Sequence, residues 1–175
     1  MKKPCRGFTV VLCALLAVLA VDFVLPSESE AAAKRAAVAS QKSPPIFAGG
    51  AGTQKSPYLL RTAAQLSAFA ASVNKGEAYA GKYVRLGANI DLKDVEWTPV
   101  GFYDQNGGTR PFKGFFDGGG FTIYHMGAGN SAKPAAAFFG ALDGATIERV
   151  SLQFVDITGE SNVGGLVGFM TGSML

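Results

Sequence analysis

The chain has 175 residues, a hydrophobic content of 48%, and 16 Lys and Arg against 13 Asp and Glu. This length predicts one domain once non-structural ends are set aside, and the net charge of +3, without a basic stripe, argues against nucleic-acid binding. Both cysteines, Cys5 and Cys13, lie in the N-terminal segment, so the rest of the chain cannot contain a disulfide. Its stability must come from apolar packing and backbone hydrogen bonds.

The N-terminus has the pattern of a secretory signal peptide. A basic start precedes an apolar run at residues 8–20, which is short for a permanent membrane helix. We assign residues 1–33 to the signal peptide, with cleavage after Ala20 or at one of two later small-residue sites. Asp22 interrupts the apolar run and disfavours an uncleaved anchor. The mature protein is therefore predicted to be secreted or on the cell surface, with membrane contact only during export.

A linker, a short strand and one helix follow the signal peptide. Residues 34–46 are rich in Ala, Ser, Lys and Pro and are predicted to form a disordered linker, and residues 58–60 a short strand. Thr62, followed three residues later by Gln65, predicts a capping box at the start of a helix. An apolar stripe at helical spacing, which we interpret as a cap over the apolar end of a repeat structure, comprises Leu66, Phe69, Ala70 and Val73.

The remainder of the chain has the pattern of short strands separated by glycine-rich turns. Apolar positions alternate with the remaining ones from Tyr83 to Leu92, which predicts one strand or two short ones bent at Gly87. Further on, Val150, Leu152 and Phe154 are assigned to one face. The alternation then slips by one residue, so that Val155 and Ile157 continue it, which indicates a corner.

Two internal correspondences indicate a repeat. Residues 135–145 match residues 163–173, so that Gly140 corresponds to Gly168 at an offset of 168 − 140 = 28. A second match places Ile147 beside Ile123, at 147 − 123 = 24. Glycine-punctuated units of this length are typical of solenoids. We therefore predict a mainly β protein, a parallel β-helix of about three coils with one short N-terminal capping helix; a leucine-rich repeat is the weaker alternative.

The order of these blocks resembles the GLUG-motif repeat proteins of bacterial surfaces. The resemblance covers residues 47–175 and is carried by SPYLLRTAAQLSAFAASVNKG, YAGKYVRLGANIDL, WTPVG, PFKGFFDGGGFTI and NVGGLVGFMTGS. It implies a right-handed β-helix of the kind found in adhesin-like proteins and in the non-catalytic N-terminal regions of immunoglobulin-cleaving zinc peptidases. The first GLUG-like unit, at residues 136–140, departs from the motif by lacking two glycines.

No catalytic, cofactor or metal site is predicted. The HExxH motif of zinc peptidases is absent, and the single histidine, His125, has no partner in sequence for a metal site or a triad. Asp104, Asp117 and Asp143 each precede or lie within a glycine-containing turn, where carboxylates commonly bond to local turn backbone. The competing hypothesis is that these three cluster on one open face and cleave a polysaccharide.

Five residues are candidate ligand contacts: Trp97, Tyr103, Asp104, Arg110 and Asp117. Aromatic rings beside a polar loop can stack on a sugar or anchor a protein, although core packing is the favoured interpretation for Trp97. We predict an exported structural or adhesive module that is not an enzyme, with an extracellular glycan or protein as partner. The alternative is a carbohydrate-binding or polysaccharide-cleaving β-helix.

The C-terminal end of the sequence follows directly on a GLUG-like motif. We expect the last coil to be uncapped, because no capping element follows Ser173. An uncapped coil exposes unpaired backbone groups, which favours end-to-end association with another chain. The repeat region is accordingly predicted to be an incomplete part of a longer repeat protein.

Overall fold

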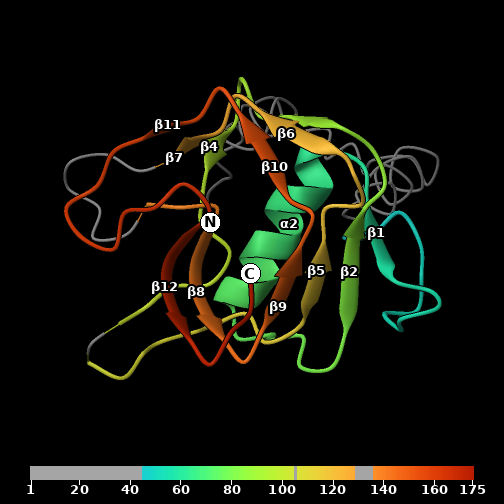
Figure 1. The fold of residues 1–175 in the computed structure, drawn as a ribbon, viewed down its shortest axis with the longest axis horizontal. Helices are drawn as coiled ribbons and strands as arrows, with labels where there is room; N and C mark the ends of the chain where they lie inside the picture. Colours follow the sequence, from blue (N-terminus) through green and yellow to red (C-terminus); the bar gives the residue numbers. More distant parts are fainter. Residues whose placement is uncertain (1–44, 105, 129–135) are drawn as a thin grey trace, which may run out of the picture. The chain divides into compact units, whose positions relative to one another are not determined.

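The computed structural model describes residues 45–104, 106–128 and 136–175. The predicted signal peptide and most of the predicted linker lie outside the described residues, and their assignment stays a prediction. The described part is mainly β with one helix (Figure 1). That helix falls short of the length and apolar character needed to cross a membrane, and the described residues include no other helix.

The strands form four sheets in which all pairs are parallel. Sheet A consists of β1 (Tyr58–Leu60), β2 (Tyr83–Leu86), β5 (Phe115–Asp117) and β9 (Thr146–Glu148). Sheet B consists of β3 (Ile90–Asp91), β6 (Thr122–Tyr124) and β10 (Ser151–Gln153). Sheet C consists of β4 (Glu96–Trp97), β7 (Gly127–Ala128) and β11 (Asp156–Ile157). Sheet D consists of β8 (Phe139–Asp143) and β12 (Val167–Thr171).

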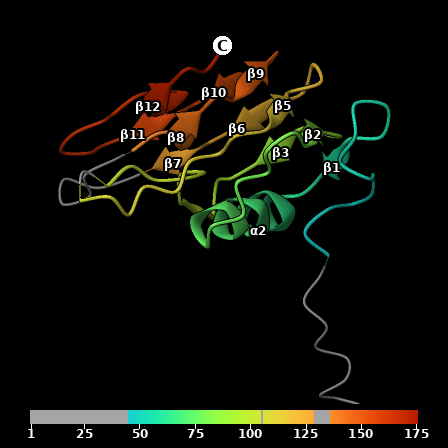
Figure 2. The ribbon, with the colours of Figure 1, turned by 90° about the horizontal axis from the view of Figure 1, so that it is seen from below.

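Successive passes of the chain add strands to the sheets in the same order, the first pass to sheets A, B and C and the next two to all four. The passes run β2-β3-β4, then β5-β6-β7-β8, then β9-β10-β11-β12, and Figure 2 shows their strands lying next to one another. Parallel pairing with this recurrence satisfies the backbone hydrogen-bonding groups between passes. The mainly β class with one helix is confirmed, and the parallel sheets are compatible with a β-helix.

The register of the sheets confirms one sequence correspondence and corrects the other. Val167 pairs with Phe139, at 167 − 139 = 28, the offset found between the glycine motifs. The 24-residue correspondence is wrong, because it aligned strands of two different sheets. Ile147 pairs with Phe116 in sheet A at 147 − 116 = 31, and Ile123 pairs with Leu152 in sheet B at 152 − 123 = 29. Both β6 and β9 follow a glycine turn and contain alternating apolar residues, so this local pattern does not show to which sheet a strand belongs.

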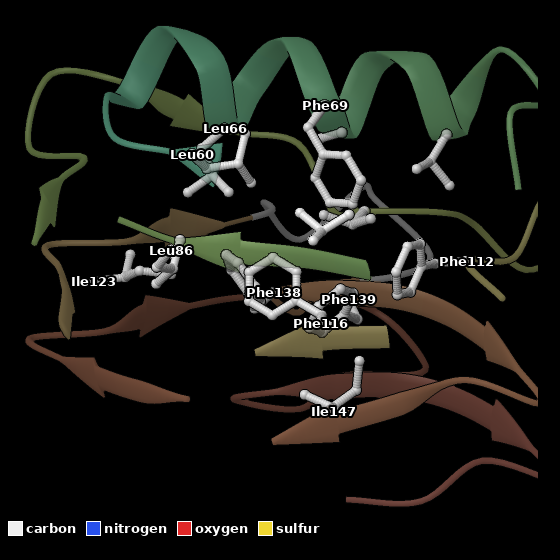
Figure 3. Close-up of a cluster of buried hydrophobic side chains, with 14 of the residues drawn as sticks. Leu60, Leu66, Phe69, Leu86, Phe112, Phe116, Ile123, Phe138, Phe139 and Ile147 are labelled. Atoms are coloured by element: carbon white, nitrogen blue, oxygen red, sulfur yellow. The ribbon is translucent and has the colours of Figure 1, made fainter. Parts of the chain in front are cut away.

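The helix α2 (Ala63–Asn74) begins and packs as the sequence predicts. The Thr62 hydroxyl accepts from the Gln65 backbone N–H at 3.2 Å, while the Gln65 side chain accepts from the Arg61 N–H at 2.9 Å. The reciprocal bond thus goes one residue earlier than in a standard capping box. All four residues of the predicted apolar stripe are buried. The helix lies beside the earliest strands (Figure 2), and Leu66 and Phe69 point from it into the core (Figure 3).

Aromatic rings dominate the core between helix and sheets. Phe69 of α2 has ring contacts with Phe112 at 5.6 Å and with Phe116 at 6.2 Å between centroids (Figure 3). Phe116 in turn packs edge-on against Phe139 at 5.2 Å. The core within the described residues holds no buried polar or charged side chain. Its stability comes from apolar burial and from the strand ladders.

A corner of the fold lies one residue earlier than the sequence pattern indicates. The pattern assigns Phe154 to the face of Val150 and Leu152 and lets Val155 continue that face, but Phe154 is 71% exposed with a φ of 54°, and Val155 is 37% exposed. A residue in the left-handed region bends the backbone sharply, and here the side chain at that bend points into solvent. His125, at the equivalent corner of the preceding pass, has φ 52° and stacks on Phe154 with centroids 5.1 Å apart.

The His125 corner also gives a pH-dependent contact. His125 Nδ1 lies 2.9 Å from Asp91 Oδ1, and this hydrogen bond, with a second from the Lys93 backbone N–H, holds the pKa of Asp91 below its ordinary value. A carboxyl whose pKa is lower in the folded state adds stability above its unfolded pKa. That stability is lost as the pH falls through the folded pKa.

Replacing His125 with glycine is expected to raise the pKa of Asp91 toward its ordinary value. The substitution removes the hydrogen-bonding ring, and glycine adopts the positive φ of this corner without strain. The Lys93 N–H remains and should keep part of the depression. An NMR titration of the Asp91 carboxyl carbon between pH 2 and pH 6, run on both proteins, measures the change. An unchanged Asp91 titration in the variant would refute the assigned cause.

Candidate functional site

The five sequence-predicted contacts lie in three different environments. Trp97 is 1% exposed, and its ring stacks on Phe138 with centroids 5.1 Å apart. The indole Nε1–H lies 3.2 Å from the Ala137 carbonyl and 3.3 Å from the Phe138 carbonyl. The core-packing interpretation of Trp97 is therefore confirmed, and its ring is inaccessible to a ligand.

Asp104 organises the loop that follows β4. Its Oδ1 accepts from the Asn106 backbone N–H at 2.8 Å, and its own N–H donates to Thr109 Oγ1 at 2.9 Å. The Thr109 hydroxyl donates back to the Asp104 carbonyl at 2.9 Å. The carboxylate thus bonds to turn backbone, as the sequence predicts, and the two bonds between the Asp104 backbone and Thr109 close the loop.

Tyr103 and Arg110, at the two ends of this loop, are also engaged within the fold. The Tyr103 ring lies 4.1 Å from that of Phe169 between centroids. Arg110 Nη1 donates to the Lys75 carbonyl at 3.0 Å, which satisfies a free acceptor at the C-terminus of α2. Its guanidinium also lies over the Phe102 ring at 5.9 Å. These contacts attach the loop to the helix and to sheet D.

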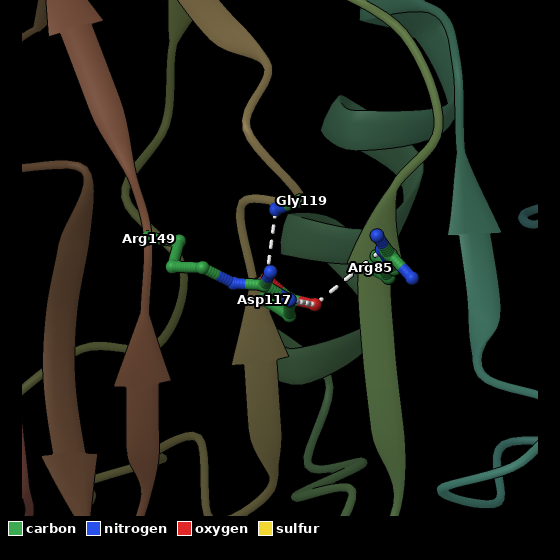
Figure 4. A network of polar contacts seen from close by, with 4 residues as sticks. All are labelled: Arg85, Asp117, Gly119 and Arg149. Atoms are coloured by element: carbon green, nitrogen blue, oxygen red, sulfur yellow. Dashed lines mark hydrogen bonds and ion pairs between the residues drawn. The ribbon is translucent and has the colours of Figure 1, made fainter.

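Of the five predicted contacts, only Asp117 lies where other charged side chains converge. Figure 4 shows Arg85 and Arg149 reaching its carboxylate from opposite sides. Oδ1 accepts from Arg149 Nε at 3.0 Å and from the Gly119 N–H at 2.7 Å, while Arg149 Nη2 also donates to Oδ2. Arg85 Nε lies 3.4 Å from Oδ2. The carboxylate thus fixes two guanidinium groups, each still substantially exposed to solvent, in defined positions.

Two aromatic rings stand next to this cluster on the outer face of sheet A. Tyr83 pairs in register with Phe115, and their rings stack at 4.3 Å with an interplanar angle of 4°. Phe115 is 37% exposed. Because side chains alternate along a strand, Tyr83 shares the outward face with Arg85, while Val84 between them is buried.

These residues line a shallow cleft of about 350 Å³, which we call the sheet A cleft. Its lining residues are Gln54, Pro57, Tyr83, Val84, Arg85, Phe115, Phe116, Asp117, Thr146, Glu148 and Arg149. Two cations and two carboxylates are present among them, so the formal charges cancel. The cleft combines an aromatic surface with charged hydrogen-bonding groups held in place by their neighbours.

The structure does not bring the three aspartates Asp104, Asp117 and Asp143 together. Asp143, at the end of β8, pairs with Lys113 at 2.6 Å, whereas Asp104 and Asp117 bond to separate sets of neighbours. Within the part of the chain that the structure describes, no three His, Cys, Asp or Glu side chains gather closely enough to hold a metal ion. The proposed clustering of carboxylates is therefore not observed.

Sequence reasoning identified Asp117 of the sheet A cleft but not the arginine and aromatic side chains that line the cleft with it. Arg85 and Tyr83 occupy polar positions of a strand that the alternation pattern had already identified. Phe115 and Arg149 come from later passes, 32 and 64 residues from Tyr83 and Arg85 (115 − 83 and 149 − 85). The outward alternation was the available signal. The parallel register of β2, β5 and β9 was needed to combine these positions.

Comparisons with known proteins give distant and partial matches. No family model matches the chain. It is 30% identical over 131 residues to halomucin of Haloquadratum walsbyi, covering 71% of this chain and 1% of halomucin. It is 30% identical over 132 residues to a candidate Gly-rich membrane protein of Evansella cellulosilytica, covering 73% of this chain and 14% of that protein. The chain thus spans a small fraction of these relatives.

A solved structure provides a fold likeness. The crystal structure of a candidate immunoglobulin A1 protease from Bacteroides ovatus matches 70% of this chain and 34% of that chain, with a TM-score of 0.54. The sequence identity is 22%, so the likeness concerns the fold alone. It agrees with the resemblance to GLUG-containing regions of such proteases.

Proposed function

We propose that the chain is an exported structural or adhesive module, built as a right-handed parallel β-helix and acting at or beyond the cell surface without catalysis of its own. The observation that carries this proposal is the recurrence of strands in the same order in parallel sheets over successive passes. Such stacking builds an elongating scaffold by repetition and presents its outer faces and loops to partners. It also needs no disulfide, in keeping with the position of both cysteines near the N-terminus.

The comparisons support a modular surface role. The matched region is 1% of halomucin and 14% of the Evansella protein, as expected for a unit that occurs within much longer chains. One of these relatives is named a membrane protein. The basic and apolar start of the sequence supports export of this chain.

The sites of the three candidate carboxylates support a non-catalytic module over a polysaccharide-cleaving enzyme. Sugar cleavage by paired carboxylates requires two acids separated by about 5 to 9.5 Å across the scissile bond. Asp104 bonds to its own loop, Asp143 to Lys113, and Asp117 to two arginines. Each carboxylate thus has a local role in holding the fold.

Export is the first consequence to test. The full chain with a C-terminal epitope tag is expected to reach the outer surface or the medium of a bacterial host, where added protease degrades it while the cells stay intact. Deleting residues 1–33, or placing a charge in the apolar run by Leu15→Arg, should retain it inside. Fractionation with immunoblotting measures both. A full chain that stays protected inside intact cells would overturn the proposed location.

A further inference from the structure

The sheet A cleft provides a ligand site that the proposed function leaves undefined. We propose that it binds one or two rings of a neutral saccharide through the Phe115 and Tyr83 rings and the guanidinium groups around Asp117. This inference rests on the proposed surface role, because it names the ligand class of an adhesive module. It concerns binding alone and requires no bond to be made or broken.

The aromatic pair supplies the apolar contact. Tyr83 and Phe115 stack almost parallel, so the face of Phe115 turned away from Tyr83 lies on the side of Thr146, its register partner on β9. Thr146 and Phe115 both line the cleft, and the Phe115 ring is partly exposed there. A pyranose ring has an apolar face of C–H groups, and a fixed aromatic ring can bury that face without ordering a flexible side chain.

The polar groups next to the rings match the hydroxyls of a sugar. Asp117 holds Arg85 and Arg149 on either side, and each guanidinium carries five N–H donors, more than these contacts use. Glu148, in register with Asp117, is exposed and has no ion-pair partner among the described residues. Neighbouring sugar hydroxyls need both donors and acceptors, and this cluster offers both within one cleft.

Charge and size favour a neutral saccharide over an acidic glycan or a folded protein. The positive charges of Arg85 and Arg149 are balanced by Asp117 and Glu148 inside the cleft, so no net charge attracts an anion. The volume of about 350 Å³ lies at the lower end of small-ligand pockets. A protein partner would require about 800 Å² of contact surface on this side alone.

Two substitutions test the site without disturbing the core. Phe115→Ala removes an outward ring, while Arg149→Gly removes one guanidinium at a position whose φ of 53° suits glycine. The purified full chain and both variants are titrated with neutral di- to hexasaccharides of glucose, galactose, mannose and N-acetylglucosamine, and with glucuronate-containing oligosaccharides. We expect binding of a neutral saccharide by the wild type, and at least tenfold weaker binding by each variant. Phe154→Ala, an exposed ring outside the cleft, is the matched control and should bind as the wild type does.

The outcomes separate this inference from the proposed function. No saccharide binding, binding of acidic oligosaccharides alone, capture of a protein partner alone, or binding unaffected by both variants each overturns the saccharide site. Circular dichroism and the unfolding midpoint verify that the variants are folded. The proposed location is tested independently, since it fails only if the full chain is retained inside cells. Release of shortened sugars by the wild type would overturn the non-catalytic assignment.

Discussion

Replacing Gly140 with alanine is expected to lower the free energy of unfolding by about 3 kcal/mol. Gly140 lies within β8, where its N–H donates to the Val100 carbonyl at 2.9 Å. A Cβ at this position would lie 2.2 Å from the Gly101 carbonyl oxygen and 3.0 Å from Pro99 Cβ. Both neighbours belong to the preceding pass of the chain, so the added methyl group would push two passes apart and weaken their hydrogen bonds.

Gly165 provides the matched control for this substitution, because it also belongs to a glycine motif. A Cβ there would have nothing within 4 Å, and its φ is outside the left-handed range. Gly165→Ala should therefore change the free energy of unfolding by no more than about 0.5 kcal/mol. Urea denaturation followed by circular dichroism measures both. Equal stability of the two variants would show that Gly140 is not required for close approach of the passes.

The contrast between these two glycines indicates what sequence reasoning could and could not provide. Local chemistry predicted the helix correctly, because the Thr62 cap and the apolar stripe are determined within one turn or two. The buried alternation of β2 was equally local. Whether a glycine allows two passes of the chain to approach closely depends on residues of the neighbouring pass. For Gly140 these neighbours are Gly101 and Gly168, which are 140 − 101 = 39 and 168 − 140 = 28 residues away in the sequence.

Register between passes is the property that the sequence left open. The 24-residue match aligned strands of sheets B and A because both have alternating apolar residues after a glycine turn. The pattern assigns Phe154 to the same face as Val150 and Leu152, because a corner made by a non-glycine residue at φ 54° has no signature in residue type. The packing of one pass against the next decides the register and the position of each corner. It depends on side chains throughout the core, so no short stretch of sequence specifies it.

The same limit explains the site predictions. Trp97, Tyr103, Asp104 and Arg110 are neighbours in sequence, yet each is occupied by contacts that hold the loop and the core together. The glycine turn after Asp117 predicts a carboxylate that bonds to local backbone, and Asp117 Oδ1 accepts a hydrogen bond from the Gly119 N–H. Its two arginines come from the passes before and after it. A ligand surface on a parallel sheet is made across strands, so proximity along the chain does not locate it.

Replacing Phe69 with alanine is expected to cost about 4 kcal/mol, because the side chain is fully buried and the cavity cannot be filled by its rigid neighbours. Phe69 connects α2 to the first passes, with ring contacts to Tyr79 at 5.2 Å and to Phe112 at 5.6 Å. If α2 caps the apolar end of the stacked strands, losing this side chain should destabilise the strands along with the helix. The single tryptophan, Trp97, lies in β4, so its fluorescence reports on a strand, whereas far-ultraviolet circular dichroism reports on helix and strands together.

The measurement compares thermal unfolding by Trp97 fluorescence with unfolding by far-ultraviolet circular dichroism. In Phe69→Ala both midpoints should fall together, since a cooperative domain loses its helix and sheets in one transition. Ala71→Ser, on the exposed side of the same helix, should cost only about 0.5 kcal/mol and leave both midpoints near those of the wild type. A Trp97 transition that stays unchanged in Phe69→Ala would mean that the strands are stable without the helix. The stacked passes would then support themselves, and α2 would not be their cap.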